Sequence, residues 1–244
     1  MTLHTTPLLG IHDALGASLV PFAGWRMPLR YGSDLEEHSA VRTAAGLFDL
    51  SHMAQIEVSG PRAAEFLDGA LVGVPSVLRS GRAKYSLITD AEGRVLDDLI
   101  VYRLAEAEYH VVANAANRER VVDALTARSL VTGTQVIDHT FSRAMIAIQG
   151  PRSAALLAEE CDADLDGLRY YAITPAAVAG APALVARTGY TGEDGFEVIV
   201  GDVAGPTVWE SLLAAGREQG LIPCGLAARD TLRLEAGMPL YGHE

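Results

Sequence analysis

The sequence predicts an α+β fold in which a β-α-β-β-β-α unit occurs twice. The segments 56–67 and 146–157 lie 90 residues apart, and each runs from a β-branched stretch through Gly-Pro-Arg into an Ala- and Leu-rich stretch. The strand-like and helix-like segments that follow occur in the same order in both halves. We therefore expect two mainly antiparallel sheets, related by a pseudo-two-fold axis.

Each copy is expected to turn from its strand into a helix at the Gly-Pro-Arg sequence. Glycine suits a helix N-cap, and proline suits the first helical position, where its missing N–H is harmless. After this helix, the first copy predicts strands over 84–89, 94–104 and 109–114 and a helix over 117–127. The second copy predicts strands over 170–174, 182–190 and 196–200 and a helix over 205–219.

Two further helices are predicted outside the repeat. Ser33 and Glu36 have the spacing of a capping box, which predicts a helix over 34–45 that Gly46 ends. A second helix is predicted over 226–236, where a glycine and a proline then end it. Since no Gly-, Ser- or Pro-rich linker separates the two halves, we expect them to share an interface.

The composition is that of a folded globular protein. Of the 244 residues, 49% are hydrophobic and 20% are charged, which excludes a disordered or collagen-like chain. The net charge of −12 disfavours nucleic acid as a partner. The longest weakly polar stretch, 173–186, contains two prolines and is too short to cross a membrane. Residues 1–11 lack the features of a signal peptide, and two cysteines imply no disulfide framework, so we expect a cytoplasmic protein.

Motifs for several common chemistries are missing from the sequence. It contains no P-loop, no dinucleotide fingerprint, and none of the HExxH, CxxC or GxSxG motifs. The seven histidines form no pair with metal-ligand spacing. We therefore expect no metal and no nucleotide cofactor. The remaining chemistry would use carboxylates, Tyr, Arg and Asn, with a bound organic cofactor where the reaction is difficult.

Two adjacent aspartates, Asp97 and Asp98, interrupt an otherwise apolar strand over 95–102. Neighbouring residues of a strand point to opposite faces, so we expect the two carboxylates not to share one site. One interpretation is that one of them faces a cavity, because a buried carboxylate without a partner is unfavourable. The alternative is that both accept nearby backbone hydrogen bonds or pair with arginine.

Polar residues also occur in the predicted turns and strand ends of both copies. The Gly-rich turn in 187–197 carries Tyr190 and leads to Glu197, on a strand equivalent to the one that ends near Asn114. Asparagine occurs only twice, at Asn114 and Asn117, in a composition that indicates GC-rich codon usage. Both asparagine positions are therefore informative.

Arg229 and Arg233 lie one turn apart on the predicted helix 226–236. Arginine binds carboxylates through two parallel hydrogen bonds, which would suit capture of an acidic ligand. The alternative is ion pairing with Asp230 and Glu235, and spacing alone favours this alternative. Three other residues, taken alone, are more typical of core or rim positions: Tyr85, Met53 and His52.

Five segments resemble the T-protein, or aminomethyltransferase, family of the glycine cleavage system. They lie in the family's order over 31–33, 37–53, 96–101, 187–197 and 225–244. The resemblance implies the duplicated folate-binding fold. It also implies tetrahydrofolate as co-substrate and the lipoylated H-protein as a transient partner. No pyridoxal phosphate is expected.

The chemistry that this resemblance implies is transfer of an aminomethyl group from the lipoyl arm of the H-protein. The products are 5,10-methylenetetrahydrofolate, ammonia and the reduced lipoyl group. A tetrahydrofolate nitrogen is the nucleophile, and the enzyme positions two reactants and stabilises a cationic carbon without a metal.

The resemblance also assigns roles to individual residues. Asp97 corresponds to the carboxylate near the reacting folate nitrogens, and Asp98 and Arg233 are expected to be structural. The remaining residues are expected to bind folate: Asn114 and Glu197 at the pterin ring, Tyr85 and Tyr190 along the molecule, Met53 at its buried surface, and Arg229 at its glutamate carboxylates.

With this family in view, we expect residues 1–52 and 138–244 to form a discontinuous first domain. Residues 53–137 would form the inserted first repeat. The family continues into a third, β-rich domain that closes over the cofactor, and the sequence ends before it. We expect this β-barrel domain to be absent and the folate pocket to be more open.

Two other functions are compatible with the same fold. Folate-binding proteins linked to iron–sulfur cluster maintenance carry a cysteine near the end of the helix that corresponds to 226–236, whereas 235–244 contains none. A folate-dependent demethylase, or the related module of flavin-dependent sarcosine and dimethylglycine dehydrogenases, is the other alternative. The dehydrogenases need a flavin domain, for which this sequence has no fingerprint.

Overall fold

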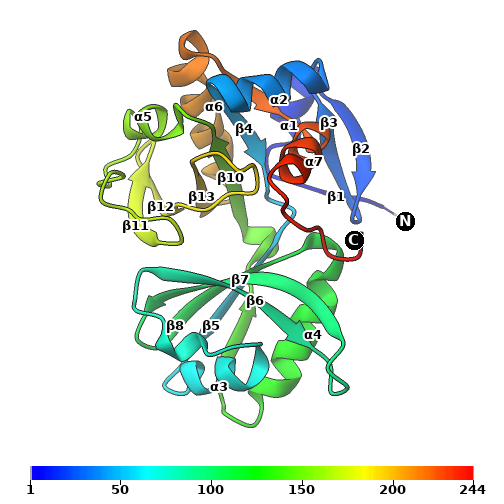
Figure 1. Ribbon diagram of the computed structural model, residues 1–244, viewed down its shortest axis with the longest axis vertical. Helices are drawn as coiled ribbons and strands as arrows, with labels where there is room; N and C mark the ends of the chain where they lie inside the picture. Colours follow the sequence, from blue (N-terminus) through cyan, green and yellow to red (C-terminus); the bar gives the residue numbers. More distant parts are fainter. Residues whose placement is uncertain (1, 244) are drawn as a thin grey trace. The chain divides into compact units, whose positions relative to one another are not determined.

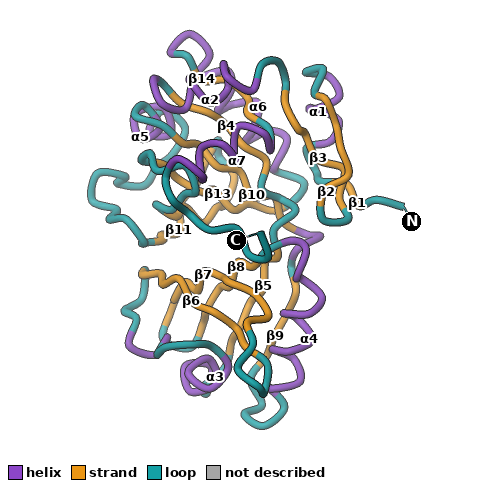
Figure 2. The backbone as a smooth tube through the Cα atoms, turned by 45° about the vertical axis from the view of Figure 1, so that its right-hand side comes forward, coloured by secondary structure: helices purple, strands orange, loops and turns teal. Residues whose placement is uncertain are grey.

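The computed structural model describes residues 2–243 and divides into two compact units. The first unit comprises Met1–His52, Ser142–Tyr170 and Thr174–Glu244, and the second comprises Met53–Phe141 with Tyr171–Ile173. Each unit contains a mainly antiparallel sheet with helices packed against it (Figures 1 and 2). The α+β class that the sequence predicts is confirmed.

The second unit contains one sheet, two α-helices and short 3₁₀-helices, which are labelled η. Its elements are β5 (Ala54–Ser59), α3 (Ala63–Ala70), η1 (Pro75–Val77), β6 (Arg82–Thr89), β7 (Val95–Ala105), β8 (Glu108–Ala113), η2 (Ala115–Asn117), α4 (Arg118–Ser129) and β9 (Gln135–Asp138). The strand order is β6-β7-β8-β5-β9. Alternate residues of β5, such as Ile56 and Val58, are fully buried in one core with Leu67 of α3 and Leu125 of α4. This alternation is the signature of a strand with one face against helices.

The main sheet of the first unit has the strand order β11-β12-β13-β10-β4-β14. Its strands and helices are β4 (Ala45–Asp49), β10 (Arg143–Gln149), α5 (Ser153–Ala158), β11 (Ile173–Val178), β12 (Ala181–Ala186), β13 (Gly195–Gly201), α6 (Gly205–Gly216), η4 (Arg217–Gln219) and β14 (Leu221–Cys224), with η3 (Thr140–Ser142) before β10. Strands β11, β12, β13 and β10 thus repeat the order of β6, β7, β8 and β5, as the duplicated sequence predicts.

The remaining elements of the first unit are a small three-stranded sheet and the helices that pack near it. They are β1 (His4–Thr5), α1 (Leu9–Ala14), β2 (Ser18–Phe22), β3 (Trp25–Arg30), α2 (Asp34–Thr43) and α7 (Leu226–Glu235). Helices α2 and α7 pack against each other. The buried side chain of His12 anchors α1 to the end of β4, since its Nε2 lies 2.8 Å from Asp49 Oδ2 and its Nδ1 lies 2.8 Å from Tyr31 Oη.

The strands that precede the two copies exchange places in the sheets. Strand β4 runs into β5 in the sequence but pairs antiparallel with β10. Strand β9 likewise runs into β10 but pairs antiparallel with β5. Each copy therefore completes the sheet of the other, and neither sheet is built from one continuous half of the chain.

The predicted helix start at Gly-Pro-Arg is wrong in both copies. Helices α3 and α5 begin after the arginine, with Arg62 and Arg152 at their N-caps. The glycines instead close a turn, because Gly60 and Gly150 have φ of 128° and 134°, which glycine adopts without strain. In the first copy Gly60 accepts a hydrogen bond from the N–H of Ala63 at 3.0 Å.

The predicted capping box and the predicted end of the next helix are also wrong. Ser33 is the N-cap of α2, but its side chain makes no capping hydrogen bond. The buried Glu37 instead accepts the N–H groups of Tyr31 and Gly32, at 2.6 and 3.1 Å. Helix α2 ends at Thr43, and Gly46 lies inside β4 rather than at a helix end.

Two predicted strands of the second copy are displaced. Strand β11 begins at Ile173 rather than residue 170, since Tyr171 adopts a left-handed φ of 57° that interrupts an extended chain. Strand β12 ends at Ala186, and residues 187–194 form a long loop before β13.

Candidate functional site

The buried carboxylate of Asp97 lies on β7 and is held entirely by amide donors. It accepts hydrogen bonds from the backbone N–H of Asn114 at 2.9 Å and from the side-chain amides of Asn114 and Asn117 at 2.9 and 2.6 Å. Burial raises the pKa of Asp97, and these hydrogen bonds oppose the rise. Asp97 is therefore bound by a backbone N–H and two side-chain amides, and not by an arginine, which the sequence had left as an alternative.

The neighbouring Asp98 shares the same asparagine. Its Oδ1 accepts the side-chain amide of Asn114 at 2.5 Å, and its Oδ2 accepts the hydroxyl of Tyr85, on β6, at 2.9 Å. The prediction that the two carboxylates cannot share a site is therefore wrong. Strand β8 ends at Ala113, so Asn114 lies just beyond the paired residues of β7 and β8. From there its side-chain amide reaches both aspartates.

The two aspartates differ in their exposure to solvent. Asp97 is 0% exposed, whereas Asp98 is half-buried and Tyr85 is 45% exposed. The half-buried Met53 directly precedes β5. In the β5–β8 ladder Ala54 pairs with Ala113, and the same register continued by one residue places Met53 opposite Asn114. The second unit thus brings Met53, Tyr85, Asn114 and the aspartate pair together.

Arg229, on α7, is the central residue of a second cluster, in the first unit. Its guanidinium carbon lies 4.6 Å from the centroid of the Tyr190 ring, in a cation–π arrangement. Burial lowers the pKa of Arg229, and the charge of Glu197 opposes this effect. Within residues 2–243, its guanidinium forms no hydrogen bond or ion pair. Of the ion pairs that spacing alone favoured, Arg233 forms the one with Asp230, whereas Glu235 pairs with Arg42 and not with Arg229.

Glu197 lies near the start of β13 and is almost fully buried. Its Oε2 accepts the hydroxyl of Thr188, and the hydroxyl of Tyr190 donates to the carbonyl of Pro239. In the β10–β13 ladder Glu197 pairs with Ala147, whereas the equivalent residue of β8 is His110, which pairs with Glu57. Glu197 thus lies within β13, whereas Asn114 lies just after the end of the equivalent strand β8, so the expectation that both come from equivalent strands is wrong for Asn114.

Two residues near these clusters were not assigned by sequence reasoning. Asn117 holds Asp97, and the rarity of asparagine was the signal that pointed to it. His52 is buried, and its Nδ1 has no hydrogen-bond partner. Burial lowers the pKa of His52 to about 4, and the positive charge of Arg229 adds to the effect. No sequence pattern distinguishes this histidine from a satisfied core residue.

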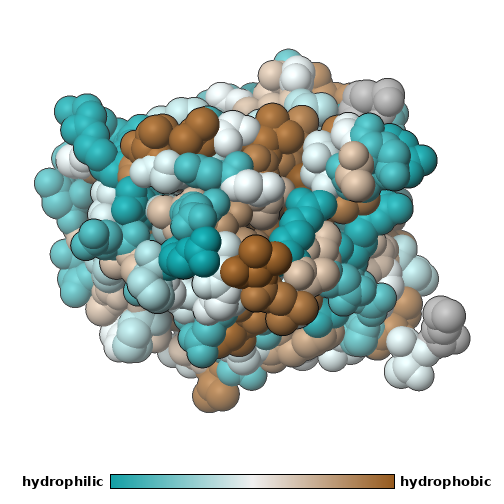
Figure 3. Space-filling view, turned by 90° about the horizontal axis from the view of Figure 1, so that it is seen from below, coloured by the Kyte–Doolittle hydropathy of each residue, from teal (hydrophilic) through white to brown (hydrophobic). Residues whose placement is uncertain are grey.

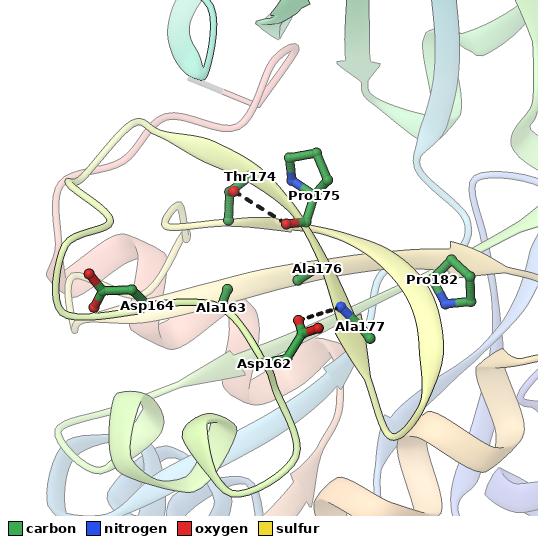
Figure 4. Close-up of a pocket in the computed structure, with 8 residues that line it drawn as sticks. All are labelled: Asp162, Ala163, Asp164, Thr174, Pro175, Ala176, Ala177 and Pro182. Atoms are coloured by element: carbon green, nitrogen blue, oxygen red, sulfur yellow. Dashed lines mark hydrogen bonds between the residues drawn. The ribbon is translucent and has the colours of Figure 1, made fainter.

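The surface hollows of the first unit differ in their relation to these residues. A shallow hollow of about 620 Å³ lies between Asp162 and Pro182, where Asp162 accepts the N–H of Ala177 at 2.7 Å (Figure 4). Its lining is mostly Ala and Pro, which offers few groups for recognition. A smaller hollow of about 390 Å³ is lined by Tyr170, Arg187 and Met238, next to Tyr190.

Other surface features add no further site. Exposed apolar side chains on the second unit include Val72, Val77, Leu130 and Val131. On the face seen in Figure 3, apolar residues form several groups separated by polar ones. Residues 2–243 contain no cluster of three or more His, Cys, Asp or Glu that could hold a metal ion. No helix in the same range is long and apolar enough to span a membrane.

Sequence relatives were found along almost the entire chain. An aminomethyltransferase of Streptomyces coelicolor is 60% identical over 242 residues, which cover 99% of this chain and 65% of that protein. An aminomethyltransferase of Moorella thermoacetica is 46% identical, and the match covers 99% of this chain and 66% of that protein. The chain therefore spans just under two thirds of the length of the curated relatives it matches.

Solved structures and a family match complete the comparison. The crystal structure of glycine cleavage system aminomethyltransferase T from Bartonella henselae has a TM-score of 0.90 and 40% identity, covering 98% of this chain and 64% of that chain. A chain of heterotetrameric sarcosine oxidase from Corynebacterium sp. U-96, with a TM-score of 0.57 and 18% identity, shows a related fold alone; the match covers 77% of this chain and 92% of that chain. The GCVT N-terminal domain matches residues 8–244. On this evidence, the chain belongs to the family of the GCVT N-terminal domain.

Proposed function

We propose that this chain binds tetrahydrofolate and acts in aminomethyl transfer within the glycine cleavage system. Its relatives carry the name aminomethyltransferase, and one structural relative is named as part of that system. The observation that carries the proposal is Arg229, a half-buried arginine on the Tyr190 ring whose guanidinium forms no hydrogen bond or ion pair within residues 2–243. A guanidinium in this state is suited to an anionic ligand with an adjacent flat group.

The family resemblance assigns each candidate residue to a part of this co-substrate. Arg229 would bind the glutamate carboxylates, with Tyr190 beside them. Glu197 and Asn114 would hydrogen-bond the pterin ring, Tyr85 would pack along the molecule, and Met53 would contact its buried surface. Bound tetrahydrofolate supplies the nucleophilic nitrogen, and the lipoylated H-protein would be the transient donor of the one-carbon unit.

Asp97 and Asp98 would have different roles in this site. The family resemblance assigns the carboxylate near the reacting nitrogens to Asp97. Its complete burial and three amide donors favour a positioning role, in which Asp97 fixes Asn114 and Asn117. The half-buried Asp98, whose Oδ2 accepts the hydroxyl of the exposed Tyr85, would be the carboxylate nearer to a bound ligand. There it would orient the co-substrate and stabilise developing positive charge.

The test is calorimetric titration of the chain with tetrahydrofolate, beside the variant Arg229→Ala. We expect binding by the unsubstituted chain and a loss of about tenfold or more in the variant, because removing a charge-assisted partner costs about 1.5–3 kcal/mol. Arg62→Ala, which removes an exposed ion pair with Glu65, is the matched control and should bind normally. Equal binding by all three chains would refute the role of Arg229, and no binding by the folded, unsubstituted chain would refute the proposal for this chain.

A further inference from the structure

The loop over residues 187–194 places Tyr190 beside α7. In the second unit the equivalent connection, between β7 and β8, is only residues 106–107. The longer loop carries Tyr190, whose ring lies against Arg229 of α7. The distance between this loop and α7 therefore decides whether the ring and the guanidinium meet.

Arg42, at the end of α2, contacts both the loop and the helix. Its Nη1 donates to the carbonyl of Thr191 at 2.6 Å and to Glu193 Oε1 at 3.1 Å. Its Nε and Nη2 donate to Glu235 Oε2, at the end of α7, at 3.2 and 3.0 Å. One planar guanidinium thus joins the loop that carries Tyr190 to the helix that carries Arg229.

The contact between loop and helix leaves little room for another arrangement. A Cβ atom on Gly192 would lie 2.9 Å from the Cβ of Ala236, just after α7. Arg42 is also partly shielded, with a side chain 24% exposed, so its ion pairs are less screened than those of a fully exposed arginine. A lysine has a single nitrogen and cannot serve acceptors on both sides in the same plane.

We propose that Arg42 is a positioning residue of the folate site, which sets the stacking of Tyr190 on Arg229 without touching the ligand. This inference rests on the proposed function. It assigns a role to a residue that neither the motifs nor the spacing of charges singled out.

The experiment is a double-mutant cycle of tetrahydrofolate binding, measured by calorimetry. We expect Arg42→Ala to weaken binding about tenfold in the unsubstituted chain, and less than about twofold when Arg229 is already replaced by alanine. A purely structural role would give the same fold-loss in both backgrounds. Arg42→Lys should behave like Arg42→Ala, and Arg62→Ala should leave binding unchanged.

The outcomes separate this inference from the proposed function. Equal losses in both backgrounds, no loss at all, or full rescue by Arg42→Lys would overturn the positioning role alone. Absence of binding by the unsubstituted chain would overturn the proposed function, and this inference with it. If Arg42→Ala does not fold, Glu193→Gln and Glu235→Gln each weaken one side of the link and should show the same dependence on Arg229.

Discussion

His52 shows how a single buried group can make the stability of this chain depend on pH. Its pKa of about 4 in the folded protein lies below the ordinary value of 6.5, because burial disfavours the charged ring. The unfolded chain therefore binds more protons below pH 6.5. The stabilising contribution is complete above pH 6.5 and is lost progressively as the pH falls towards 4.

We expect the free energy of unfolding to fall by about 3 kcal/mol between pH 7 and pH 4 through His52. Replacing His52 with Asn removes this titration, so the variant should show a correspondingly flatter pH profile over this range. The measurement is chemical denaturation at several pH values. Parallel profiles for the two chains would contradict the assignment of this dependence to His52.

The two aspartates of β7 make separable predictions at the same scale. Asp97→Asn replaces one carboxylate oxygen by an NH2 group, which leaves at least one of the three buried amide donors facing another donor, and should destabilise the fold by about 1–3 kcal/mol. Asp98→Asn keeps an acceptor at a half-buried position, so its stability should change little while tetrahydrofolate binding weakens. Denaturation and calorimetry on both variants check this. Normal stability with lost binding in Asp97→Asn would instead support the role that the family resemblance implies for Asp97, beside the reacting folate nitrogens.

At the scale of elements, two glycines differ in whether their surroundings leave space for a side chain. Gly46 lies in β4, where an added Cβ would meet Val41 Cγ2 at 2.5 Å and Cys224 Sγ at 2.7 Å. Gly69 lies inside α3, where an added Cβ meets nothing within 4 Å. The first glycine permits close packing of β4 against α2 and β14, whereas the second only weakens its helix.

We therefore expect Gly46→Ala to destabilise the chain by about 1–3 kcal/mol through overpacking. Gly69→Ala should stabilise it by about 0.5–1 kcal/mol, because alanine loses less backbone entropy in a helix. Thermal or chemical unfolding of the two variants measures both effects. Destabilisation by Gly69→Ala, or none by Gly46→Ala, would show that the packing around these two glycines differs from the structure.

At the scale of the whole molecule, charge is unbalanced. The chain has 31 acidic and 19 basic residues, a net charge of −12, and self-repulsion of this kind disfavours the compact state. Added salt screens the repulsion, so we expect the unfolding temperature to rise with sodium chloride. A gain of about 1 kcal/mol corresponds to roughly 2–4 °C for a chain of this size. A decrease in the unfolding temperature would mean that screened ion pairs outweigh the repulsion.

The duplication, the fold class and most elements were readable from the sequence, because hydrophobic periodicity and turn residues act locally. Helix α7 and the strands β6, β7 and β8 lie close to their predicted bounds. Several errors occur where a residue has a partner far away in the sequence: Glu37 also accepts the N–H of Gly225, Gly46 packs against Cys224, and Tyr171 accepts the N–H of Ala83.

The sequence by itself determined the repeated units and, through family motifs, the candidate residues. Only the tertiary structure decided that Asp97 and Asp98 share Asn114, that Arg229 has no carboxylate partner in the described chain, and that Arg42 joins the loop to α7. It also decided the exchange of β4 and β9 between the sheets. Local patterns record which face of an element is apolar, whereas hydrogen bonds and packing between residues distant in the chain depend on how the elements assemble.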